Sequence, residues 1–164
     1  MCFAYGFYAI SLLYREGIVL SIVAEYRVNF FDTDAMKVVH HANYIRWFEI
    51  GRVEYLRNLG ITLDDMMADG FVFPITEVKA KYVSPGYFDD VLCIETRATA
   101  LTKVKMAFDY RVYRKSDGTT LVTGHTQNVF TSRESGQIVR LPAKYHERLQ
   151  KAMEQERAEK KQEQ

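Results

Sequence analysis

Residues 31–44 read FDTDAMKVVHHANY and bring two carboxylates, two histidines and an amide into one short stretch. The residues before them, from Ile22 to Phe31, alternate or run apolar, which is typical of a half-buried strand. From Asn43 to Leu59 the apolar period becomes that of a helix, and Gly60 offers the left-handed position at which helices end. The polar stretch is therefore predicted to form a strand-to-helix turn, where amides of a helix start can face a ligand oxygen.

The predicted helix 43–59 is apolar on more than one side. Tyr44, Phe48 and Tyr55 share one side of the helical wheel, while Ile50 and Val53 lie on the opposite side. Such a helix needs cover on more than one side, as when a sheet curls round it.

The rest of the chain is predicted to be mostly strand. A short helix at Thr62 to Asp69 precedes four segments rich in β-branched or aromatic residues: Phe71 to Ser84, Asp90 to Leu101, Val104 to Lys115 and Thr119 to Arg133. The links between these segments are short, which favours an antiparallel meander. A final helix begins at Pro142, and its last ten residues are expected to fray. The predicted fold class is α+β, with a five-stranded antiparallel sheet, one long central helix and a C-terminal helix.

Composition sets outer limits on function. The chain has 164 residues, of which 48% are hydrophobic, so we expect one domain at 21–150, an N-terminal extension at 1–20 and a charged tail at 151–164. Twenty-two basic and 21 acidic residues give a net charge of +1, which indicates neither nucleic-acid binding nor attraction to an anionic membrane. The apolar start, Met1 to Leu13, is too short to span a membrane, and no membrane insertion is expected. Two cysteines without metal-ligand spacing fit a reducing compartment, and we expect the cytoplasm.

Asp34 is the first candidate for catalysis. A carboxylate at the end of a strand and near a helix start can act as a general base on water or as a nucleophile. The alternative is that Asp34 caps a turn, which is the role expected of Asp32.

His41 is the second candidate. It lies just before the predicted helix, where its own N–H and those of Ala42, Asn43 and Tyr44 form a possible substrate-binding oxyanion site. Its imidazole could also orient a substrate, or simply satisfy a carbonyl. A metal held by Asp32, Asp34, His40 and His41 is not expected, because adjacent histidines point apart unless the turn is unusual.

Two further charged groups stand out. Glu49 and Arg52 are three residues apart on the helix and are predicted to form an ion pair, with catalysis by Glu49 as the lesser alternative. Lys103 and Lys105, with Arg97 nearby, form a small basic cluster that could hold the phosphates of a ligand or could be a solvated face.

Residues 34–44, together with Trp47-Phe48-Glu49 and Arg52, resemble the 4-hydroxybenzoyl-CoA thioesterase family. The similarity is strongest to the acyl-CoA thioester hydrolases associated with the Tol-Pal system. A second patch, FDDVLCIET at residues 88–96, resembles the third strand of the same family. The resemblance extends over about residues 23–149.

This resemblance implies a hotdog fold, in which a five-stranded antiparallel sheet wraps round the helix 43–59. Proteins of this family form homodimers with a continuous sheet, often paired into homotetramers, and their active sites lie at the dimer interface. The resemblance assigns Asp34 as the catalytic carboxylate and His41 as the residue whose backbone N–H polarises the thioester carbonyl. Lys103 and Lys105 fall where related enzymes place basic residues against the CoA phosphates.

Two positions depart from the family pattern. Lys37 stands where a glycine is usual, three residues after the catalytic Asp34, and this affects the expected geometry of the turn. Phe30 replaces a tyrosine of some relatives, so no role can rest on a hydroxyl there.

The sequence thus predicts an acyl-CoA thioesterase that needs neither metal nor cofactor and has an acyl-CoA substrate. The alternative is a non-catalytic acyl-CoA sensor or binding module built on the same fold.

Overall fold

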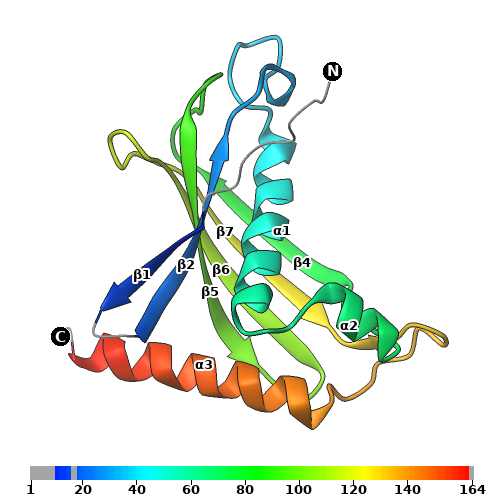
Figure 1. Cartoon of the computed structure of the whole chain (residues 1–164). Helices are drawn as coiled ribbons and strands as arrows, with labels where there is room; N and C mark the ends of the chain where they lie inside the picture. Colours follow the sequence, from blue (N-terminus) through cyan, green and yellow to red (C-terminus); the bar gives the residue numbers. More distant parts are fainter. Residues whose placement is uncertain (1–9, 16–17, 163–164) are drawn as a thin grey trace, which may run out of the picture.

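A computed structural model describes residues 10–15 and 18–162 of the chain. Its main feature is a six-stranded antiparallel sheet with the strand order β1-β2-β5-β6-β7-β4. The helix α1 (His41–Asn58) lies along one face of this sheet, and α3 (Ala143–Gln162) crosses its lower end in Figure 1. The strands of the sheet are β1 (Ile10–Arg15), β2 (Ile18–Arg27), β4 (Ile75–Tyr82), β5 (Val91–Leu101), β6 (Lys105–Arg114) and β7 (Thr120–Val129).

Smaller elements join these layers. A 3-10 turn, η1 (Phe30–Asp32), follows β2, and α2 (Leu63–Ala68) follows α1. The short strands β3 (Phe71–Val72) and β8 (Thr131–Ser132) pair with each other outside the main sheet.

The predicted α+β class with five antiparallel strands and a C-terminal helix is confirmed. A sixth strand, β1, pairs with the first part of β2, and both segments lie within or next to the stretch 1–20 that was expected to be an extension. Residues 1–9 lie outside the described part of the chain. The helix α3 continues to Gln162, which is further than expected from a fraying tail.

The prediction of a simple meander is wrong for one strand. β5, β6 and β7 are sequential neighbours, but β4 pairs with β7 at the far edge rather than with β5. The tight links 102–104 and 115–119 close hairpins, whereas the link 83–90 is long enough to lead from one edge of the sheet to another strand. The first strand also ends earlier than predicted, at Arg27, because residues 30–32 form η1.

The sheet covers α1 on several sides, as the apolar pattern predicted. The helix contacts β2, β5, β6 and β7, and Tyr44, Phe48 and Tyr55 are buried. Gly51 allows a close approach, because a Cβ added there would lie 2.1 Å from Thr96 Oγ1. Glycine at this position therefore lets α1 lie close against β5.

The helix ends follow the predicted signals. Gly60 has a positive φ of 67°, and its N–H donates to the Arg57 carbonyl at 2.9 Å. Thr62 caps α2, since its Oγ1 accepts the N–H of Asp65 at 3.1 Å. No helix in the described ranges is long and apolar enough to cross a membrane.

The predicted ion pair between Glu49 and Arg52 is not formed. Glu49 is exposed, whereas Arg52 is only 7% exposed and its Nη1 donates to the Tyr110 hydroxyl at 3.5 Å. That hydroxyl also shares a hydrogen bond of 2.8 Å with Thr126 Oγ1. Arg52 therefore points toward the sheet, away from the exposed side that carries Glu49.

Candidate active site

Asp34 lies in a tight turn between η1 and α1. Its N–H donates to the Val38 carbonyl at 3.0 Å, and its carbonyl accepts the Lys37 N–H at 2.9 Å. Its Oδ1 accepts the N–H of Met36 at 2.8 Å. The other carboxylate oxygen forms no hydrogen bond within the described residues. The turn thus fixes the carboxylate through one oxygen and leaves the second available to a ligand.

Lys37 has a left-handed backbone, with a φ of 62°. A side chain in this region costs more than glycine, since Cβ approaches the following carbonyl oxygen. Its exposed side chain forms no ion pair within the described residues. Position 37 therefore adopts a backbone conformation that favours glycine, and Lys37 holds it with some strain.

We expect Lys37→Gly to raise the free energy of unfolding by up to about 1 kcal/mol, because glycine relieves the backbone strain at position 37. Glycine also raises the conformational entropy of the unfolded chain, which offsets part of this gain. Chemical denaturation of both proteins measures the difference. Lys37→Asn, which also tolerates this backbone region, is the matched control and should stabilise less. A Lys37→Gly protein less stable than wild type would contradict the strain.

Asp32 has a structural environment. It is 4% exposed, and its Oδ2 accepts the Tyr26 hydroxyl and the Asn29 N–H, each at 2.8 Å. Its carbonyl accepts the His40 N–H at 2.9 Å and the Asn43 Nδ2 at 2.7 Å. Asp32 thus ties the end of β2 to the start of α1. Across residues 10–15 and 18–162, no three His, Cys, Asp or Glu side chains are placed to hold a metal ion.

The first turn of α1 leaves one amide unused. His40 is the N-cap residue, and its Nδ1 accepts the N–H of Ala42 at 3.2 Å. The His40 carbonyl accepts the N–H of Asn43 at 2.9 Å. The His41 N–H has no acceptor among the described residues. Of the amides predicted to bind substrate, those of Ala42 and Asn43 are thus already bonded, and that of His41 is free.

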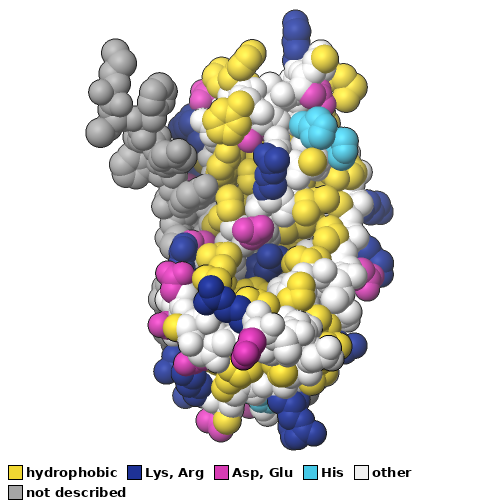
Figure 2. Space-filling model, turned by 90° about the vertical axis from the view of Figure 1, so that its right-hand side faces the viewer, with side chains coloured by type: hydrophobic (Ala, Val, Ile, Leu, Met, Phe, Trp, Pro, Cys, Tyr) yellow, Lys and Arg dark blue, Asp and Glu magenta, His cyan; other side chains and the backbone are white. Residues whose placement is uncertain are grey.

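Asp34 and His41 line the same pocket, which has a volume of about 320 Å³. The aromatic side chains of Tyr44 and Tyr82 also line it. The remaining lining residues are mostly apolar: Met36, Val38, Val39, Val83, Ser84 and Pro85. Figure 2 shows histidine side chains at the upper end of a hollow in which hydrophobic side chains gather. Asp34 and the first residue of α1, whose amide is free among the described residues, therefore line one mainly apolar pocket.

Two tyrosines hold this pocket together. The buried Tyr44 hydroxyl accepts the N–H of Gly86 at 3.2 Å, and burial raises the pKa of Tyr44, which keeps it protonated. The Tyr82 hydroxyl donates to the His41 carbonyl at 3.1 Å. The sequence predicted a strand at Tyr82 but no part in the site, because no local motif indicates that the end of β4 meets the start of α1. The wall formed by residues 82–85 was missed for the same reason.

The predicted basic cluster lies elsewhere in the chain. Lys105 begins β6, and the Lys103 carbonyl accepts the N–H of Leu141 next to α3. The Asp34 pocket lies instead beside the end of β4, at the opposite end of the sheet. Arg97 pairs with Glu95 on β5 rather than joining the two lysines. Within one chain, then, Lys103 and Lys105 are not brought to the pocket.

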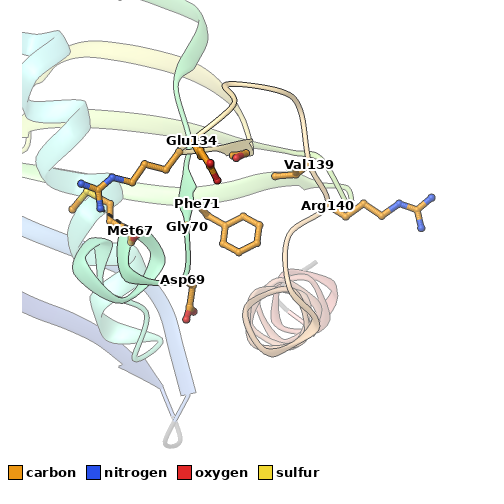
Figure 3. A pocket seen from close by; sticks show the side chains of 9 residues that line it. Met67, Asp69, Gly70, Phe71, Glu134, Val139 and Arg140 are labelled. Carbon is orange, nitrogen blue, oxygen red and sulfur yellow. Dashed lines mark hydrogen bonds between the residues drawn. The ribbon is translucent and has the colours of Figure 1, made fainter.

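A second and larger cavity, of about 720 Å³, lies between α2, β3 and the turn before α3. Figure 3 shows that Phe71 projects toward it, whereas Arg140 points away. Asp69 at its edge is held by Lys144 and by the Tyr145 hydroxyl. No predicted site residue lines this cavity.

Comparison with known proteins places the chain in a family. Residues 28–151 match the model of the thioesterase-like superfamily. The acyl-CoA thioester hydrolase YbgC of Escherichia coli O6:H1 is 34% identical over 86 residues, which cover 52% of this chain and 64% of that protein. A hypothetical protein from Thermus thermophilus has a similar structure, with a TM-score of 0.75 and 29% identity, covering 79% of this chain and 98% of that one. The DHNA-CoA thioesterase from Staphylococcus aureus shares the fold, with a TM-score of 0.76 and 22% identity over 87% of this chain and 94% of that one.

Proposed function

This chain belongs to the thioesterase-like superfamily, and we propose that it is an acyl-CoA thioesterase that hydrolyses a CoA thioester to a free carboxylic acid and CoA. The observation that carries this proposal is that Asp34 and His41, whose amide is unbonded among the described residues, line one pocket. A thioester carbonyl needs both a donor for its oxygen and a group that delivers a nucleophile to its carbon.

The helix start would stabilise the charge that develops on the carbonyl oxygen. In the proposed step the carbonyl oxygen accepts the His41 N–H, and the aligned peptide dipoles of α1 add partial positive charge at the same end. The neighbouring amides of Ala42 and Asn43 stay bonded to His40, so they hold the turn rather than the substrate. The Tyr82 hydroxyl bonded to the His41 carbonyl would fix the plane of this peptide.

Asp34 would deliver the nucleophile by one of two routes. As a general base it takes a proton from water, the water oxygen bonds to the carbonyl carbon, and the C–S bond breaks to release the CoA thiolate. As a nucleophile its free oxygen attacks the carbon and displaces the thiolate, giving a mixed anhydride that water then cleaves. In both routes the thiolate takes up a proton. The bond from Met36 to Oδ1 would orient the second oxygen for either step.

The dimer expected of the family would complete the site. β4 is an edge strand of the sheet with the partly exposed side chains Ile75, Val78 and Tyr82. Antiparallel pairing of two β4 strands about a two-fold axis would place the start of one β4 beside the end of the other. Because the start of β4 and the start of β6 lie at the same end of the sheet, Lys103 and Lys105 of one subunit would approach the other subunit's pocket.

Analytical ultracentrifugation tests this assembly, since a dimer or tetramer is expected and a monomer at all concentrations would contradict it.

The cytoplasmic location stays a prediction from the cysteine content.

Thiol release across a panel of CoA esters tests the activity. We expect CoA to be liberated from at least one ester, at a rate measured with a chromogenic thiol reagent. The apolar lining of the pocket favours an apolar acyl group over a charged one. A sensor would instead bind an ester, as measured by calorimetry, without releasing thiol, and that result would replace the enzyme proposal.

A further inference from the structure

His40 caps α1 with a ring nitrogen rather than with an oxygen. Its Nδ1 accepts the Ala42 N–H at 3.2 Å, and its carbonyl accepts the Asn43 N–H at 2.9 Å. Among the N–H groups of His41, Ala42 and Asn43, these two bonds use those of Ala42 and Asn43. Only the N–H of His41 stays unbonded among the described residues. We propose that His40 is a positioning residue, whose neutral imidazole holds the first turn of α1 so that the His41 amide is the donor left for the substrate. This inference rests on the proposed function.

The cap depends on the protonation state of the ring. Imidazole Nδ1 accepts a hydrogen bond only in the neutral form that carries its proton on Nε2. A second proton would turn Nδ1 into a donor that faces the Ala42 N–H, also a donor. A cation at the N-terminal end of α1 is also disfavoured by the helix dipole. Protonation of His40 would therefore break the cap and loosen the turn that holds the His41 amide.

His40 is anchored by its backbone and lies beside a second imidazole. The His41 ring lies against the His40 ring, with ring centroids 4.2 Å apart and an angle of 31° between the ring planes. The His40 N–H donates to the Asp32 carbonyl at 2.9 Å, which anchors the residue whatever the ring carries.

No carboxylate within the described residues forms an ion pair with the His40 ring. The titratable or charged groups nearest to it on the neighbouring elements include Asp32, Asp34 and Lys37 before the helix, His41, Tyr44 and Arg46 on α1, and Tyr82 on β4. The Asp32 carboxylate already accepts from Tyr26 and Asn29, and Asp34 Oδ1 accepts from Met36.

Two variants separate the cap from the imidazole. His40→Ala removes the acceptor, whereas His40→Asn supplies a side-chain oxygen that is among the best caps and does not titrate. At pH 8 we expect kcat of His40→Ala to fall roughly three- to tenfold, with KM changed less, and kcat of His40→Asn to recover most of that loss.

The pH profile carries the stronger test. Histidine changes charge within roughly pH 5 to 8, so wild-type kcat should fall more steeply on acidification than kcat of His40→Asn. Asp34 and His41 are present in both proteins, so their own titration contributes to both profiles. The proposal would be overturned if kcat depended on pH in the same way in wild type and His40→Asn and if His40→Ala kept the kcat of wild type.

Nuclear magnetic resonance detects the hydrogen bond between the His40 ring and the Ala42 N–H independently of catalysis. The amide resonance of Ala42 should shift with the same midpoint as the His40 ring in wild type, and that shift should be absent in His40→Asn. An Ala42 resonance that does not follow the ring would refute the cap. If wild type releases no thiol from any CoA ester, the proposed function fails, whereas this measurement still decides whether the imidazole holds the helix start.

Discussion

Replacing Asp34 with Asn is expected to lower kcat by about 10²- to 10⁴-fold, the range that a positioned acid or base contributes. The amide has nearly the same shape, and its oxygen can still accept the Met36 N–H that Asp34 Oδ1 accepts at 2.8 Å. It can neither take a proton from water nor attack the thioester. Steady-state thiol release measures the loss, and the thermal midpoint should change little because the side chain is not buried.

Asp32→Asn is the matched control, two residues away. The buried Asp32 carboxylate accepts from Tyr26 and Asn29, so loss of its charge should cost roughly 1 to 3 kcal/mol of stability. Asp34→Asn should therefore keep its stability and lose turnover, whereas Asp32→Asn should lose stability. Near-normal turnover of Asp34→Asn would remove Asp34 from the mechanism.

Replacing His41 with Pro should lower kcat by about 10²- to 10³-fold, which is the usual loss when one oxyanion donor is removed. His41 is the first residue of α1, where proline is tolerated because the N–H has no helical partner. The preceding His40 has a φ of −61° and a ψ of 131°, which are values that a residue before proline can adopt. The substitution thus deletes the amide hydrogen while the helix start keeps its shape.

His41→Ala separates the backbone from the side chain. It loses the imidazole but retains the amide, so its turnover should exceed that of His41→Pro by tenfold or more. Circular dichroism checks that α1 persists in both proteins. If the two variants lose activity equally, the imidazole rather than the amide is the group that matters at position 41.

The sequence predicted what depends on local pattern. The bounds of α1 and α2 follow from the change of apolar period, Gly60 and Thr62, and the structure places both elements within two residues of the expectation. The choice of Asp34 and His41 came from a compact motif, and the two residues do line one pocket. These features depend on few long-range contacts, so the pattern of residues that are adjacent in the sequence is enough to predict them.

What the sequence missed depends on contacts between distant segments. Tyr82 lies 41 residues after His41, and no pattern around it shows that its hydroxyl meets the His41 carbonyl. Likewise, the partner of Arg52 is Tyr110, 58 residues away, rather than the carboxylate three residues before it. The pairing of β4 with β7 was missed because link length alone does not specify which neighbour a strand selects.

The path of the chain from β4 across to β5 has a consequence for how such a pocket can change. One wall, residues 34–44, carries the groups that we propose to react, and Asp32 ties it to the start of α1. The rest of the lining comes from Tyr82 at the end of β4, whose hydroxyl donates to the His41 carbonyl, and from residues 83–85 of the connection that follows. The proposed mechanism assigns no reacting atom to residues 83–85. Mutations at residues 83–85 can therefore reshape the pocket without removing a group of the proposed mechanism. Related proteins could in this way change the range of substrates that they accept while they keep the proposed hydrolysis reaction.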